Sequence, residues 1–405
     1  MINKYISTEN KIFKEYLNKR IIKNFDQKYS TVIKNVNRDL NQSKKTLNVL
    51  GKNFKLNFKF EDLKKFKKFK SIVILGMGGS ILGSEAIYYF LKDRIKKRVY
   101  FIDNIDSEKI LKLKKKLNYK KTLFIIISKS GNTIETFSNF LSFNVIKKNT
   151  KNIIIISEKK NSLLFALSKK MNLFYIEHKD YIGGRFSVLS EVGMVPAYLM
   201  GLKIPNLRQN LKRYLERKEK LFLKDSTTKL ANLLYEKKIN NLVFINYLPK
   251  LEKFLYWCQQ LIAESLGKKG KGFLPVISNS PKDHHSLLQL YLDGPKDKLF
   301  YIFYHEEKPD LKINTKKFVT NINYLHNKSL NKVKKAQKNA LIQSLKKNRI
   351  PFREFELKKI TEETLAELFS YFILETVIIG NLLNLNPYNQ PAVEQVKINT
   401  KKLLD

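Results

Sequence analysis

Short, uninterrupted runs of apolar residues recur through the first half of the chain, with helical stretches between most of them. The first run, Ser71–Leu75, leads into the glycine-rich residues 76–80 and then into a helical stretch that ends near Leu91. Further runs occupy residues 99–102, 123–127 and 153–156. Runs of this kind are typical of buried strands. Their alternation with helices predicts a parallel α/β sheet.

A second alternating unit follows a charged, helical connector at residues 205–226. Its predicted strands are 242–247, 273–277 and 299–304, and its predicted helices are 252–266, 283–292, 332–347 and 361–384. Residues 1–60 carry apolar residues at mixed three- and four-residue spacings, which predicts a helical segment.

Together these elements predict an α/β fold with two doubly wound parallel sheets and helical N- and C-terminal extensions. The predicted division is a helical segment at 1–60, a first domain at 61–204, the connector, a second domain at 227–384 and a tail at 385–405. Hydrophobic residues make up 43% of the 405 residues, and aromatic residues make up 12%. That content is enough to bury a core in each domain.

The net charge is large and positive. Lysine and arginine number 78 against 36 acidic residues, which gives +42. Such a charge can indicate a nucleic-acid or membrane partner. The lysines are dispersed along the chain, however, and no zinc-knuckle, RNP or basic-zipper pattern accompanies them. We therefore expect no specific nucleic-acid partner, and the positive field should instead help to attract an anionic substrate.

The sequence predicts no membrane-spanning segment, no signal peptide and no intrachain disulfide. The first residues contain no apolar stretch of signal-peptide length, and the longest apolar stretch, around 368–383, is interrupted by Ser370, Glu375 and Asn381. The single cysteine, Cys258, excludes an intrachain disulfide. These features predict a cytoplasmic protein without a membrane partner.

Two loops at predicted strand ends carry the groups that bind phosphate. In the first, Gly79 and Ser80 follow strand 71–75 at the start of a helix. In the second, Ser128, Ser130 and Thr133 gather hydroxyl groups around Lys129. Amides at a helix N-terminus, hydroxyls and a cation together suit a phosphate. An ordinary turn and an ordinary helix cap are the alternatives, although a cap needs only one such hydroxyl. Both loops should lie at the same edge of the sheet.

Two further segments carry charge that could act on a substrate. Arg185 follows two glycines, so its guanidinium can approach a ligand closely and stabilise an oxyanion. Gln260 and Glu264 are four residues apart and share one face of a predicted helix, where Glu264 could serve as a general base. A surface arginine and a solvent-facing glutamate are the alternatives, and each is the better interpretation when its segment is taken alone.

The histidine pair and the terminal lysine complete the candidates. His284 and His285 are adjacent and would point in different directions on a helix, so a shared metal site is not expected. One of them could shuttle a proton near neutral pH. Lys397 lies in the tail and could be a catalytic ammonium. A helix-terminal polar residue and a solvated lysine are the alternatives.

The order of these segments resembles the glucose-6-phosphate isomerase family. The similar segments are the 76–80 turn, the Ser-Lys-Ser loop at 128, Gly-Gly-Arg at 183, the Gln260 and Glu264 helix, His285 with Ser-Leu-Leu-Gln behind it, and 388–397 with its final lysine. The resemblance implies two sugar-isomerase domains. Asn132 and Glu191 depart from the usual pattern, in which a threonine and a small residue or proline stand at those positions.

The resemblance also implies an activity, the interconversion of D-glucose 6-phosphate and D-fructose 6-phosphate through a cis-enediol, in glycolysis and gluconeogenesis. Glu264 would be the base, Arg185 would stabilise the enediolate, and His285 and Lys397 would move protons during ring opening. The residues implied to hold the phosphate are Ser128, Lys129, Ser130, Thr133 and Gln260, with Gly79 and Ser80 at its approach.

No metal and no organic cofactor are implied by this resemblance. A homodimer is implied, with the histidine of each site supplied by the other subunit. A dual phosphoglucose/phosphomannose isomerase and a non-catalytic sugar-phosphate sensor on the same fold are the alternatives.

Overall fold

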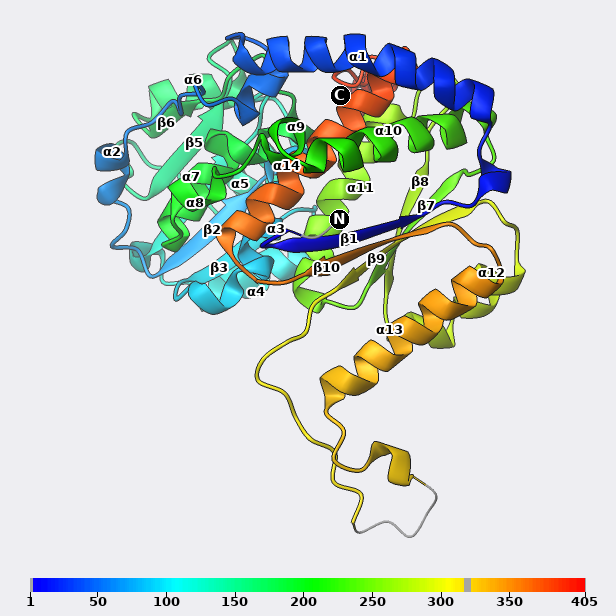
Figure 1. Cartoon of the computed structure of the whole chain (residues 1–405). Coiled ribbons are helices and arrows are strands. Elements are labelled where there is room, and N and C mark those ends of the chain that lie inside the picture. Colours follow the sequence, from blue (N-terminus) through cyan, green and yellow to red (C-terminus); the bar gives the residue numbers. More distant parts are fainter. Residues whose placement is uncertain (1–2, 317–321, 405) are drawn as a thin grey trace.

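The first sheet is parallel throughout and has the strand order β3-β2-β4-β5-β6. The computed structural model describes residues 3–316 and 322–404 (Figure 1). The strands are β2 (Ser71–Leu75), β3 (Arg98–Ile102), β4 (Thr122–Ile127), β5 (Ile153–Ser157) and β6 (Phe174–Glu177). The four predicted strands are confirmed. The edge strand β6 is additional: it has only four residues, Phe-Tyr-Ile-Glu, and one of them is buried.

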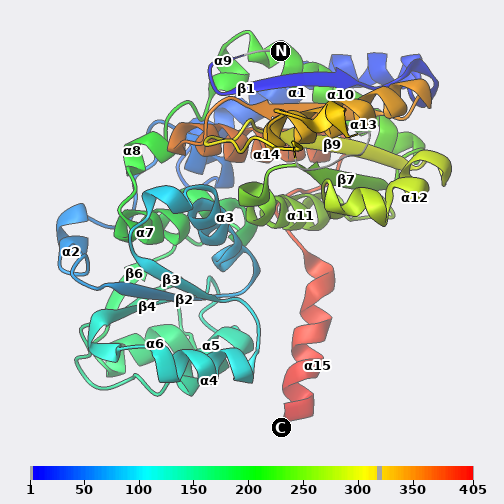
Figure 2. The same ribbon diagram turned by 90° about the horizontal axis from the view of Figure 1, so that it is seen from below.

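Helices cover both faces of this sheet, as a doubly wound fold requires (Figure 2). One face carries α4 (Ser107–Lys116), α5 (Ile134–Ser142) and α6 (Leu163–Lys170), which bury Leu113, Phe140 and Leu164 against it. The other face carries α3 (Leu82–Phe90) and α7 (Glu191–Met200), which join the larger core between the two sheets.

The second sheet has the order β1-β10-β9-β7-β8. Its strands are β1 (Ile6–Lys11), β7 (Asn241–Asn246), β8 (Leu274–Asn279), β9 (Lys298–Tyr304) and β10 (Phe352–Leu357). Strand β1 pairs antiparallel with β10, and the other pairs are parallel. The helical prediction for 1–60 is therefore wrong at its start. Only Ile6 and Thr8 of β1 are buried, so its polar sequence has no strand-like apolar run.

Helices surround this sheet too. One face packs against α10 (Glu219–Glu236), α11 (Glu252–Leu266) and α14 (Glu362–Leu382), and the other against α12 (Leu288–Asp293) and α13 (Leu330–Lys347). The outer helix α1 (Lys19–Asn41) crosses α10 and α14 (Figure 1). The predicted helix 283–292 is instead a short 3₁₀ turn, Lys282–His285, followed by α12.

The predicted connector consists of short helices that run into a long one. They are α8 (Ile204–Leu207) and α9 (Arg213–Glu216), and the predicted boundary at residue 226 falls inside α10. The division into domains stays a prediction. Residues 1–2 of the N-terminal segment, 317–321 of the second domain and 405 of the tail lie outside the described part of the chain.

Helix α14 is the one helix in the described residues that is long and apolar enough to cross a membrane. Of its most apolar window, 94% is buried inside the protein. Its charged residue Glu375 pairs there with Arg353 of β10, the two atoms Nη1 and Oε1 lying 2.6 Å apart. Burial as a core helix accounts for the apolar composition of α14, and this ion pair joins the helix to the sheet.

The last helix, α15 (Glu394–Leu404), extends away from the body of the protein (Figure 2). It buries none of its residues, and it leaves Val396, Leu403 and Leu404 68%, 86% and 70% exposed. Exposed leucines in a row of this kind mark a surface suited to contact with another chain.

Candidate active site

The two predicted phosphate loops lie at one edge of the first sheet. Strands β2 and β4 are neighbours and parallel, so the 3₁₀ turn Gly78–Ser80 and the loop that begins at Ser128 both leave the sheet at its carboxyl edge. This confirms the expected arrangement of the loops. Ligands of open α/β sheets bind at this edge.

The hydroxyl groups of the second loop form a cluster. Oγ of Ser128 lies 2.8 Å from Oγ1 of Thr133, and Oγ of Ser130 lies 3.4 Å from the same atom. Thr133 precedes the first turn of α5 without capping it through its side chain. The cluster thus lies at a helix N-terminus with open amides, which is the geometry that favours an anion.

Two neighbours of the cluster have other partners. The ammonium of Lys129 donates to the carbonyl oxygen of Asp180 at 2.7 Å and lies 3.4 Å from a carboxylate oxygen of Glu158, so its contacts lie outside the cluster. Asn132, the departure from the usual threonine, accepts a hydrogen bond from the amide of Leu163. Asn132 therefore ties the loop to α6.

Arg185 is the centre of a buried network. It is 2% exposed, and its Nη1 lies 2.8 Å from Oε2 of Glu264. The remaining bonds go to Oγ of Ser265, Oε1 of Gln390 and the carbonyl oxygens of Pro387 and Asn389. These bonds use all five donors of the guanidinium. Burial lowers the pKa of Arg185, and the charge of Glu264 partly offsets that shift.

Glu264 combines a fixed position with access to the surface. It lies near the end of α11, where Gln260 donates from Nε2 to its Oε1 at 2.9 Å, as their four-residue spacing predicts. Arg185 holds its other oxygen. The Glu264 side chain is nevertheless 31% exposed, so a ligand can reach this carboxylate.

The glycine loops bring the two halves of the chain together at this place. A Cβ on Gly79 would lie 2.2 Å from the carbonyl carbon of Gly184, so only glycine lets the 76–80 turn touch the segment that carries Arg185. A Cβ on Gly78 would lie 2.9 Å from Nε2 of Gln260. Oε1 of Gln260 is buried and has no hydrogen-bond partner among the described residues. A buried acceptor of this kind marks a place that a ligand or water satisfies.

Two residues near the carboxylate were not singled out from the sequence as site residues. Lys268 follows α11, and its ammonium donates to the carbonyl oxygen of Asn386. Burial and the charge of Arg185 lower its pKa to about 8. Gln390 contacts Arg185 directly. The only sequence signal for Lys268 and Gln390 is that they lie beside or within segments that resemble the family. The sequence does not show which side chains of a loop point toward the site.

The histidines have different surroundings. Nε2 of His284 lies 2.8 Å from the hydroxyl of Tyr247, and burial lowers the pKa of His284. His285 is exposed, at the end of the 3₁₀ turn after β8. Lys397 lies on the extended helix α15 and pairs with Glu394 at 2.6 Å. The described contacts do not join His285 or Lys397 to the Arg185–Glu264 pair of the same chain.

The arrangement provides a carboxylate that can take a proton, a buried cation beside it and a cluster of hydroxyls at a helix N-terminus. A fixed carboxylate can act as a general base. A preorganised cation stabilises negative charge that develops next to it. The geometry therefore suits proton abstraction from a phosphorylated substrate.

Comparison with known proteins agrees with this geometry. Residues 29–405 match the family described as phosphoglucose isomerase. This chain belongs to the phosphoglucose isomerase family. It is 34% identical to the probable glucose-6-phosphate isomerase of Methanococcus maripaludis, over 93% of this chain and 88% of that relative. It is also 34% identical to the glucose-6-phosphate isomerase of Mycoplasmopsis pulmonis, over 84% of each.

Two solved structures superpose on most of this chain. A hypothetical protein from Thermus thermophilus has a TM-score of 0.79 at 26% identity and covers 96% of this chain and 99% of its own. A glucose-6-phosphate isomerase from Chlamydia trachomatis has a TM-score of 0.68 at 19% identity, over 85% of this chain and 71% of its own. The second likeness bears on the fold alone.

Proposed function

We propose that this protein interconverts D-glucose 6-phosphate and D-fructose 6-phosphate. The carboxylate of Glu264 carries the proposal, because it is fixed by Arg185 and Gln260 while a third of its side chain stays exposed. Family membership supports the same reaction. A coupled assay with glucose 6-phosphate and the purified chain tests it. We expect the reaction to take place in the cytoplasm.

The chemistry is a proton transfer between adjacent carbons of the open-chain sugar. Glu264 takes the proton from C2, the electron pair of that bond forms the C1–C2 double bond, and the electron pair of the C1 carbonyl moves to O1, which gives an enediolate. A proton then moves from the C2 hydroxyl to O1. Return of the carbon-bound proton from Glu264 to C1 leaves a carbonyl at C2 and a hydroxyl at C1. Since the five donors of Arg185 are held by protein groups, we assign it to positioning Glu264 and to stabilising the enediolate through its charge.

The hydroxyl cluster is assigned to the phosphate of the substrate. Changing Ser128 and Thr133 together to Ala should raise KM for fructose 6-phosphate about 100-fold or more, because each of the two lost hydrogen bonds to a charged group contributes about 1.5–3 kcal/mol. The turnover number should change much less, since the cluster binds a part of the substrate that does not react. Steady-state kinetics measures both.

A matched control for this variant is Ser142→Ala. Ser142 ends α5, and its exposed hydroxyl donates to the carbonyl oxygen of Ser138. This control should keep the KM of the unchanged protein. An unchanged KM in the double variant would show that the phosphate of the substrate does not bind at this loop.

His285 and Lys397 are assigned to the protons of ring opening, with His285 acting at the site of the other subunit of a homodimer. The exposure of His285 and its separation from the contacts of Glu264 support this assignment. The extended helix α15, with its exposed leucines, supports an association of two chains.

Mixing two inactive variants tests the shared site. In a mixed dimer of Glu264→Gln and His285→Ala, one site carries both changes and the other carries neither. Random exchange of equal amounts should make about a quarter of all sites intact in a twofold-symmetric dimer. The specific activity of the mixture, with exchange followed by native mass spectrometry, measures the recovery.

A control pair comes from the contact between Arg185 and Glu264 within one chain. A mixture of Arg185→Lys and Glu264→Gln leaves one change in every site, so it should recover no activity. Persistent inactivity of the first mixture after complete exchange would place His285 in the site of its own subunit and would leave the isomerase proposal standing.

A further inference from the structure

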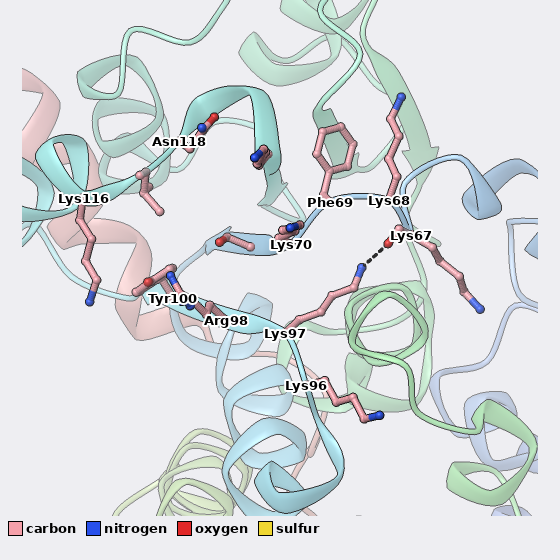
Figure 3. Close-up of a pocket in the computed structure, with 13 residues that line it drawn as sticks. Lys67, Lys68, Phe69, Lys70, Lys96, Lys97, Arg98, Tyr100, Lys116 and Asn118 are labelled. Atoms are coloured by element: carbon pink, nitrogen blue, oxygen red, sulfur yellow. Dashed lines mark hydrogen bonds between the residues drawn. The ribbon is translucent and has the colours of Figure 1, made fainter.

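A polar cavity lies at the edge of the first sheet opposite the candidate active site. It has a volume of about 510 Å³ and is lined by residues from 67–71, 96–100 and 116–121 (Figure 3). These segments lead into β2, β3 and β4, whereas the active-site loops leave the carboxyl ends of the same sheet. The cavity is therefore separate from the candidate active site.

The lining of this cavity, which we call the basic cavity, is strongly cationic. Eight of its thirteen residues are lysine or arginine, and none is acidic. Within the part of the chain that the structure describes, none of the eight is in an ion pair with a carboxylate. Many lysines elsewhere have such partners, including Lys109, which pairs with Asp103, and Lys250, which pairs with Asp93. The charge in the basic cavity is not neutralised by the protein.

Backbone hydrogen bonds hold the three basic segments together. The amide of Lys70 donates to the carbonyl oxygen of Lys121 at 3.0 Å, and the amide of Arg98 donates to the carbonyl oxygen of Lys70 at 3.3 Å. The ammonium of Lys97 donates to the carbonyl oxygen of Lys67 at 2.9 Å (Figure 3). The cations are thus gathered by the sheet itself and not by independent, mobile loops.

Gathering like charges in this way is unfavourable without a counter-charge. Burial and the neighbouring charge of Lys67 lower the pKa of Lys97. Like charges repel each other even in bulk water, and more strongly where the surroundings are less polar. An anion with several charges would offset the repulsion of many pairs at once, and a single carboxylate would offset few.

We propose that the basic cavity binds a small molecule that carries a chain of phosphate groups, such as inorganic triphosphate or a nucleoside triphosphate. Several adjoining charges on the ligand match the eight cations. The volume suits a compact ligand, since small-molecule sites occupy about 300–1,000 Å³. The half-buried ring of Tyr100 also lines the cavity, and the ammonium of Lys116 lies over this ring, 5.6 Å from its centroid.

Isothermal titration calorimetry with inorganic triphosphate and with ATP, both without metal, tests this site. Saturating fructose 6-phosphate keeps the phosphate loop of the active site occupied. We expect one triphosphate per chain, with an affinity at least tenfold lower in the variant Lys70→Gln, Arg98→Gln, Lys121→Gln. Tighter binding of ATP than of triphosphate would identify a nucleotide as the ligand, and equal binding would identify the phosphate chain alone.

The control variant is Lys19→Gln, Lys23→Gln, Lys34→Gln. It removes the same charge from exposed positions of α1 and should bind triphosphate normally. Equal weakening in both variants would show a general effect of net charge and overturn the site. Tighter, steeply salt-dependent binding of a 20-base duplex would show an extended nucleic-acid surface and would also overturn it.

Discussion

Changing Glu264 to Gln is expected to lower the turnover number about 10²–10⁴-fold, which is the usual contribution of a general base. The amide keeps the shape of the side chain and can still accept a bond from Arg185, but it cannot take a proton at neutral pH. Exchange of a C1 proton of fructose 6-phosphate with solvent deuterium should fall in parallel, because the same carboxylate removes that proton in the reverse direction. NMR of fructose 6-phosphate in D₂O measures that exchange directly, without a coupling enzyme.

A control on the same helix is Glu252→Gln. Glu252 begins α11, and its Oε1 accepts a hydrogen bond from the side-chain amide of Asn279 at 2.6 Å. Glutamine can also accept this bond. This variant should turn over normally. The Glu264→Gln variant itself should bind fructose 6-phosphate with nearly normal affinity. If Glu264→Gln turned over at a near-normal rate, Glu264 would be excluded as the base.

The largest effect on stability is expected at the buried pair of Arg353 and Glu375. Both side chains are essentially buried, at 0% and 4% exposed. Tyr301 and Tyr371 complete the network with hydroxyls bonded to Arg353 and Glu375. Burial disfavours the charge of Arg353, but Tyr301 and Glu375 outweigh it, so its pKa is raised. Glu375→Gln leaves that cation uncompensated and should lower the free energy of unfolding by about 3–5 kcal/mol.

Urea denaturation measures this loss, and two further variants locate its cause. Arg349→Gln breaks an exposed pair with Glu15 and should cost less than about 1 kcal/mol. Replacing both buried partners, Arg353→Met with Glu375→Leu, should recover part of the loss, because no charge is then left unpaired. A loss below about 1 kcal/mol in Glu375→Gln would mean that the pair contributes little.

The sequence predicts strands well where both faces of a strand are buried. β2, β4 and β5 are continuous apolar runs because helices cover the sheet on both sides. It fails for β1 and β10. In β10 the charged Arg353 interrupts the apolar pattern, yet the residue is buried, since its partner lies on α14. A tertiary ion pair of this kind has no local signal in the sequence.

The same difference governs the candidate site. The position of the two phosphate loops follows from parallel strands, and the Gln260–Glu264 contact follows from helix periodicity. The bond between Arg185 and Glu264 joins residues that are 79 positions apart in the sequence. No local pattern predicts such a contact, and it becomes visible only in the folded structure. Lys129 shows what the sequence could not predict. It lies beside Ser128 and Ser130 in the sequence, but its ammonium donates to the carbonyl oxygen of Asp180.

Strand β1 imposes an order on the folding of the newly made chain. Its partner β10 leaves the ribosome about 340 residues later, which at the usual rate of synthesis is a delay of roughly 17–70 s. During that time β1 has no edge to pair with. Its polar composition, Ser-Thr-Glu-Asn-Lys after one isoleucine, suits this wait, because an unpaired apolar strand would invite aggregation. Strand β1 can therefore join the edge of the second sheet only after β10 has been made, although β1 is synthesised long before β10.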